Sequence, residues 1–96
     1  MHIYMREWHP GDVTPLHSHA RYRKSILVLR GRLEEYIEHM DGTDDTNIYE
    51  TGEWFDMDAS MGEHALHART YVITLEAYVG HRECIPEDIR GERIYI

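Results

Sequence analysis

The chain has 96 residues, which suffices for one small domain, and we expect residues 1–96 to form a single unit. Its 10 basic and 18 acidic residues give a formal net charge of -8, which would repel phosphate backbones and anionic lipids, so we expect no nucleic acid and no membrane partner. The single cysteine, Cys84, excludes an intrachain disulfide, and the chain shows neither a signal-peptide pattern nor an apolar run of the ~20 residues that span a bilayer, so we expect a cytoplasmic protein.

Short runs of β-branched and aromatic residues alternate with Gly, Asp and Pro, and no segment has the period of a long amphipathic helix. In chain order these runs predict strands at 3–8, 13–19, 25–29, 33–39, 46–50, 53–56, 64–68 and 70–79, with a further edge strand at 92–96. Asp41-Gly42 predicts a hairpin with a type I′ turn, and Gly31 predicts a second tight turn. Many short strands in one small chain predict an all-β barrel or jelly roll.

His17 and His19 lie two residues apart in the second predicted strand. Residues i and i+2 of a strand point to one face, so both imidazoles should project into the barrel beside Val13 and Pro15. Two neutral imidazoles on one wall form a natural half of a metal site.

The residues around this pair are spaced in a distinctive way. Five residues separate Gly11 from His17, four separate His19 from Lys24, and six separate Lys24 from Gly31. This spacing resembles the first signature of the cupin superfamily. A second, degraded motif begins at Gly52 and reaches His64 through residues 58–63, where cupins usually carry a Pro and a Gly. The resemblance covers residues 11–79.

The resemblance implies a cupin-type antiparallel β-barrel, also described as a double-stranded jelly roll. It also implies one divalent transition metal, which could be Fe, Zn, Mn, Ni or Cu. His17, His19 and His64 match three of the usual four ligands, whereas the fourth, normally a glutamate, falls on Lys24.

Lys24 should point inward with Ile26 and Val28, and a buried ammonium beside a divalent cation is unfavourable. Three resolutions are open. Lys24 could lose its proton and act as a base or nucleophile. It could turn toward a carboxylate, for which Glu35 is the nearest candidate, or the metal could be absent and leave an anion-binding or acid/base pocket.

His67 is the rival of His64 for the third ligand position. The two have opposite parity in a regular strand, so only one of them can face inward. The spacing from Gly52 favours His64.

These features favour a metal-dependent enzyme acting on a small polar or anionic metabolite, with Lys24 and Tyr22 as catalytic candidates. Oxygen-dependent cleavage, isomerisation or epimerisation, and lyase or cyclisation chemistry all remain open. The alternatives are a non-catalytic module that senses a metabolite or a metal, and a structural cupin with a vestigial site. We further expect a homodimer that covers the outward side chains Leu27 and Leu29 together with the 92–96 strand.

Overall fold

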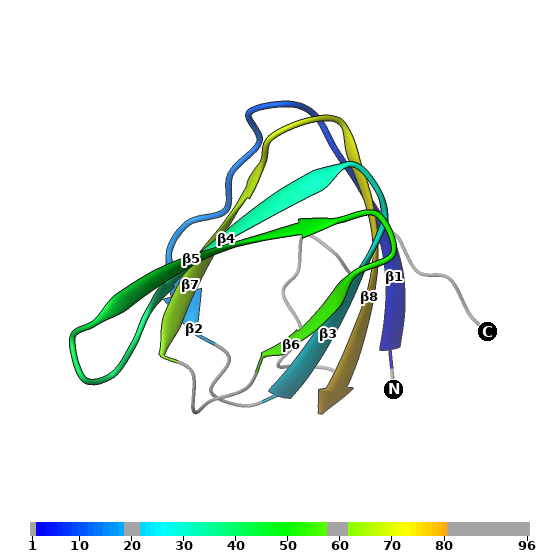
Figure 1. Cartoon of the computed structure of the whole chain (residues 1–96). Coiled ribbons are helices and arrows are strands. Elements are labelled where there is room, and N and C mark those ends of the chain that lie inside the picture. Colours follow the sequence, from blue (N-terminus) through cyan, green and yellow to red (C-terminus); the bar gives the residue numbers. More distant parts are fainter. Residues whose placement is uncertain (1, 19–21, 58–61, 81–96) are drawn as a thin grey trace.

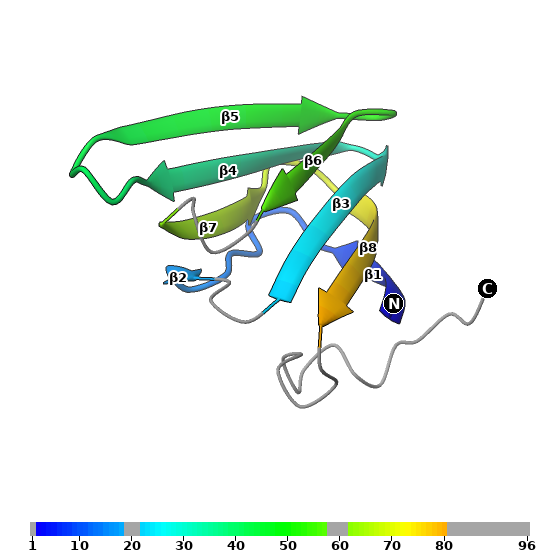
Figure 2. The ribbon, with the colours of Figure 1, turned by 90° about the horizontal axis from the view of Figure 1, so that it is seen from below.

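The structure is a computed structural model that describes residues 2–18, 22–57 and 62–80. Within these residues, eight strands form two four-stranded antiparallel sheets, in the orders β1-β8-β3-β6 and β2-β7-β4-β5. The two sheets face each other as the walls of a barrel, which confirms the predicted all-β class (Figure 1; Figure 2 shows the same arrangement from below). In chain order the strands are β1 His2–Trp8, β2 His17–Ser18, β3 Tyr22–Arg30, β4 Arg32–Glu38, β5 Asp44–Glu50, β6 Trp54–Met57, β7 Glu63–Ala68 and β8 Val72–Gly80.

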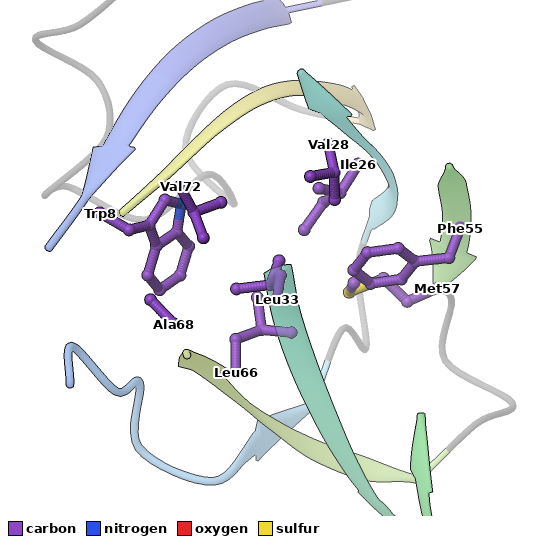
Figure 3. Close-up of a cluster of buried hydrophobic side chains, with 9 residues drawn as sticks. All are labelled: Trp8, Ile26, Val28, Leu33, Phe55, Met57, Leu66, Ala68 and Val72. Atoms are coloured by element: carbon purple, nitrogen blue, oxygen red, sulfur yellow. The ribbon is translucent and has the colours of Figure 1, made fainter. Parts of the chain in front are cut away.

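Burial alternates along the strands, because successive side chains of a strand point to opposite faces of the sheet. Nine buried apolar side chains from both sheets meet in one cluster between the walls (Figure 3). Each such side chain contributes roughly 1.5–3 kcal/mol on leaving water, so this cluster supplies much of the driving force for folding. Its members are Trp8, Ile26, Val28, Leu33, Phe55, Met57, Leu66, Ala68 and Val72.

Gly31 is the single residue between β3 and β4, where the chain leaves one sheet for the other. Its φ of 96° lies in the left-handed region, and a Cβ atom placed there would lie 2.1 Å from the carbonyl oxygen of Tyr71. The two crossings between the sheets therefore pack backbone against backbone here, which confirms the tight turn expected at Gly31 and explains why it holds glycine.

The hairpin expected at Asp41-Gly42 joins β4 to β5, but its turn is not of type I′. A type I′ turn needs positive φ at both central residues, and in the described part of the chain only glycines have positive φ. Gly42 has a φ of 89°, while the Asp41 carboxylate accepts hydrogen bonds from the backbone and hydroxyl of Thr43. That side-chain acceptor stabilises a longer turn in which only one residue needs left-handed geometry.

The strand expected at 13–19 is shorter than predicted and less regular. Only β2, His17–Ser18, is a strand, and the pairing with β7 slips by one residue between the bridge Val13–His67 and the pair His17–His64. Pro15 lies within the slip and has no N–H for a ladder hydrogen bond. As a result Val13 is 67% exposed, and the prediction that it lies inside with His17 is wrong.

The predicted boundaries of the other strands agree with the structure to within a few residues. Cys84 and the edge strand expected at 92–96 lie outside the described residues. No helix among the described residues has the length and apolar character needed to cross a membrane.

Replacing Gly31 with Ala should destabilise the fold more than the same change at Gly42. Both variants force alanine to a φ near +90°, which costs about 1–3 kcal/mol, but nothing lies within 4 Å of a Cβ at Gly42. At Gly31 the new methyl also displaces the Tyr71 backbone, and we expect an added loss of about 2 kcal/mol or more. Urea unfolding measures both variants, and equal losses would contradict this account of the crossing.

Candidate functional site

The barrel interior is apolar toward one end and polar toward the other. Across the first sheet, Trp8 pairs with Val72 at the apolar end, and Tyr78 pairs with Lys24 near the opposite end. The buried polar or charged side chains among the described residues are Lys24, Glu35, His64, Thr74 and Glu76. Buried charges are stable only when paired and hydrogen-bonded, so the contacts of these groups define the candidate site.

His17 and His64 face each other across the edge of the second sheet, where β2 pairs with β7 in direct register. Their Nε2 atoms lie 3.0 Å apart, and their ring centroids are separated by 4.4 Å. His64 is 1% exposed and His17 is half-buried. We call these two residues the histidine pair.

The other ring nitrogen of each histidine already meets an oxygen. His17 Nδ1 lies 2.7 Å from the carbonyl oxygen of Pro15, and His64 Nδ1 lies 2.9 Å from Glu35 Oε2. A carbonyl and a carboxylate can only accept, so each neutral ring carries its proton on Nδ1 and directs an Nε2 lone pair toward the other ring. Two lone pairs at 3.0 Å repel each other, and a proton or a metal cation between or beside them would relieve this repulsion.

An additional proton on His17 is disfavoured by the surroundings of that ring. Burial lowers the pKa of His17 below its usual value. The hydrogen bond to Pro15 opposes this effect, whereas the electrostatic effects of His64 and of the charges on Lys24 and Arg6 add to it. The last two charges come from the first sheet, so both walls of the barrel face this site.

Glu35 is held from its other side by Tyr49. The Tyr49 hydroxyl donates to Glu35 Oε1 at 3.2 Å, and the Tyr49 ring stacks on Phe55 with centroids 3.9 Å apart. Burial, followed by the negative charge of Glu35, raises the pKa of Tyr49 to about 12, so its hydroxyl keeps its proton and donates.

On the opposite wall, Glu76 is the centre of a second group of contacts. Its Oε1 lies 2.8 Å from Lys24 Nζ and accepts a hydrogen bond from the Tyr78 hydroxyl at 3.3 Å. Its Oε2 accepts from Thr74 Oγ1 at 2.8 Å and lies 3.5 Å from Arg6 Nε. Each oxygen of this fully buried carboxylate therefore meets one cation and one hydroxyl.

These contacts keep Glu76 ionised. Burial alone would raise its pKa, but the charges of Lys24 and Arg6, with hydrogen bonds from Lys24 and Thr74, hold the pKa below its usual value.

Solved structures share this architecture, although no protein-family model and no curated protein matches the sequence. The cupin domain of Drosophila melanogaster CENP-C superposes with a TM-score of 0.70 at 8% identity, over 80% of this chain and 59% of that one. A cupin-2 domain protein from Shewanella frigidimarina gives 0.65 at 15% identity, over 82% of this chain and 69% of that one. An oxalate oxidase gives 0.67 at 19% identity, over 81% of this chain and 42% of that one.

This chain has a cupin fold. The two-sheet topology and the three superpositions agree on it, as the spacing around Gly11 and His17 predicted. The chain spans less than two thirds of the CENP-C domain and less than half of the oxalate oxidase.

The fold brings together only part of the expected ligand set. His17 and His64 converge inside the cupin barrel, whereas His19 lies outside the described residues. Within residues 2–18, 22–57 and 62–80, no group of three or more His, Cys, Asp or Glu side chains is arranged to hold a metal ion. His64 rather than His67 points inward, as the spacing predicted.

Lys24 points into the barrel as predicted, but the carboxylate expected to pair with it was the wrong one. Lys24 meets Glu76 on β8, while Glu35 on β4 contacts His64 and Tyr49. The reason is the sheet order, which places β3 beside β8 and leaves β4 in the other sheet. Tyr22 begins β3, but its side chain is outside the described part.

Glu76 and Arg6 are site residues that the sequence motifs did not predict. A signal was present in the alternation of each strand, because Glu76 shares its parity with Val72 and Tyr78, and Arg6 shares its parity with Trp8. A charged residue on the buried parity of a strand needs an opposite charge nearby.

Replacing Glu76 with Gln should destabilise the fold in a way that depends on pH. Because the folded pKa of Glu76 lies below the unfolded value near 4.5, its ionised form stabilises the fold above that pH. This contribution disappears as the pH falls through the folded pKa. At pH 7 we expect the free energy of unfolding of the variant to be about 3–5 kcal/mol lower than that of wild type, since Lys24 and Arg6 lose their shared counter-charge.

Urea unfolding from pH 7 down to pH 3 measures this difference, which should shrink below pH 4.5. Glu50→Gln, at the exposed pair with Arg32, is the control and should lose no more than about 1 kcal/mol. If the difference in unfolding free energy between wild type and Glu76→Gln stayed constant from pH 7 to pH 3, Glu76 would not be the ionised centre of this group of contacts.

Proposed function

We propose that the chain is a metal-dependent enzyme acting on a small anionic metabolite, with the metal held by His17, His64 and His19. The observation that carries this proposal is the histidine pair, with both Nδ1 atoms on oxygen acceptors and the Nε2 atoms 3.0 Å apart. Two ligands at right angles around an ion, each about 2.1 Å from it, are separated by about 3 Å. The pair is therefore already spaced as two neighbouring ligands of one ion.

The donor set favours a divalent transition metal, which could be Fe, Zn, Mn, Ni or Cu. Imidazole ligands bring no charge, so a centre of this kind keeps its full charge and attracts an anion. When bound, the metal would supply a Lewis acid that polarises an oxygen of the substrate.

The opposite wall supports an anionic substrate as well. The cationic side chains of Lys24 and Arg6 meet at the Glu76 carboxylate, and their charges reach His17. Because Lys24 Nζ lies 2.8 Å from the Glu76 carboxylate, we assign Lys24 the role of holding the anion or donating a proton to it, rather than that of a base. Tyr22, at the start of β3, remains a second candidate for this role.

The alternative is a cupin that binds a metabolite, a metal or a protein without catalysing a reaction. One observation favours it, because the Drosophila melanogaster CENP-C protein has also been solved bound to CAL1. An enzyme should turn over a substrate and lose activity in Lys24→Gln, whereas a binding module should only change its affinity. A vestigial site should bind neither metal nor metabolite.

The chain should bind about one equivalent of a transition metal, and the double variant His17→Ala/His64→Ala should lose it. Metal content after purification without a polyhistidine tag, and the metal-induced rise of the thermal midpoint, measure this. The matched control is His9→Ala/His39→Ala, which removes two histidines that contact the exposed carboxylates of Glu7 and Asp45 and should leave both readouts unchanged. A wild-type chain that neither retains metal nor is stabilised by it would rule out the enzyme proposal.

We also propose that the chain forms a homodimer through the outer face of the sheet β1-β8-β3-β6. Register places four apolar side chains in one row across this face, and two of them are largely exposed. The row consists of Met5, Leu75, Leu27 and Trp54. In a dimer with a two-fold axis, the apolar row of one copy would pack against the same row of the second copy. Because both rows are apolar, this pairing favours a dimer over a foreign partner.

Leu27→Ser/Trp54→Ser should shift the mass in solution at micromolar concentration from dimer to monomer. Light scattering coupled to gel filtration measures the mass. Met40→Ser, at the highly exposed turn between β4 and β5, is the control and should remain dimeric. A monomeric wild-type protein would overturn the proposal.

A further inference from the structure

We propose that Glu35 is a positioning residue that orients His64 toward His17 and supplies a carboxylate charge to the metal centre from behind the His64 ring. This inference rests on the proposed metal site. It assigns to Glu35 a role different from the pairing with Lys24 that the sequence suggested.

The contact between Glu35 and His64 is buried and specific. Both residues are 1% exposed, and Glu35 Oε2 lies 2.9 Å from His64 Nδ1. β4 pairs with β7 so that Glu35 faces Leu66 and His64 faces Ile37, which makes Glu35 and His64 diagonal neighbours on the inner face. Two rigid adjacent strands therefore hold the donor and the acceptor in place.

Tyr49 prevents the Glu35 carboxylate from turning away. Its hydroxyl donates to Oε1 while Oε2 faces His64, so the two oxygens have separate partners. The Tyr49 ring is itself fixed, because it stacks on Phe55 with an interplanar angle of 9°. Phe55 belongs to β6, so the carboxylate is braced by both sheets.

The charge of Glu35 has a specific consequence for the metal centre. Lys24 stands at the position where the cupin resemblance implies a glutamate ligand, so the centre has no carboxylate from that position. A carboxylate that accepts from Nδ1 fixes the tautomer of a histidine ligand and makes its Nε2 a stronger donor. Glu35 thus returns part of the missing negative charge through the His64 ring.

The test compares the affinity of Zn²⁺ for tag-free wild type, Glu35→Gln, Tyr49→Phe and Glu34→Gln, by competition with a chromogenic chelator. Glu35→Gln keeps the shape and loses the charge, and it should bind about ten- to a hundredfold more weakly. Tyr49→Phe removes the hydrogen bond that braces the carboxylate and should lose about fivefold. Glu34→Gln is the matched control, because Glu34 is the neighbour of Glu35, has the opposite parity and pairs with Arg69, so the affinity should not change.

Equal affinities in wild type, Glu35→Gln and Tyr49→Phe would overturn this inference while leaving the metal site intact. Absence of Zn²⁺ binding by wild type would overturn both. If Glu35→Gln fails to fold, Tyr49→Phe carries the same comparison.

A second measurement needs no metal. The ring ¹⁵N chemical shifts of His64 in metal-free wild type should show a protonated Nδ1 and an unprotonated Nε2. A protonated Nε2 with an unprotonated Nδ1 would contradict the assigned role of Glu35, whatever the metal affinity.

Discussion

The approach of two imidazole nitrogens to 3.0 Å, each carrying a lone pair, is the constraint on which the rest of the site depends. It exists because His17 and His64 are direct partners across β2 and β7, and because each Nδ1 is occupied by an oxygen acceptor. Burial and nearby positive charge both lower the pKa of His17. A metal cation bound by both rings would relieve the repulsion between the two lone pairs, which is why the proposed metal site is built on this pair.

Two buried carboxylates divide the polar end of the barrel between them. Glu35 serves the histidine pair from the second sheet, and Glu76 holds Lys24 and Arg6 on the first. Each carboxylate has partners on both oxygens, which offsets the cost of removing its charge from water. Because their partners differ, the two carboxylates can be varied separately, and a change at the histidine pair need not alter the contacts of Lys24 and Arg6.

Strand parity predicted the parts of this arrangement that depend on one strand alone. It placed Lys24 inside with Ile26, and spacing chose His64 over His67; both proved correct because β3 and β7 alternate regularly. The pairing of Lys24 with Glu76 could not be read in the same way. It depends on β3 lying beside β8, a contact between segments about 50 residues apart in the sequence that spacing within a motif does not encode.

The fold class followed from the number of short strands and from the resemblance, whereas local irregularities did not follow from either. The pattern at Asp41-Gly42 predicted the hairpin but not its turn, because the Asp41 side chain stabilises an alternative with one left-handed residue. The proposed histidine ligands likewise do not predict which metal would bind, since neutral imidazoles suit several ions.

The slip at Pro15 has a consequence for which side chain the edge of the barrel places beside His64. Residues before Pro15 follow β7 in one frame, with Val13 opposite His67, and those after it follow in another, with His17 opposite His64. The same proline offers the carbonyl oxygen that His17 Nδ1 contacts. The number of residues between Gly11 and His17, more than their chemical nature, therefore decides which side chain arrives at His64. Because the slip absorbs one residue, deleting one residue between Val13 and His17 would let the first frame run on without a break and still bring His17 opposite His64. Adding one residue there while both frames are kept would bring Leu16 to that place instead of an imidazole.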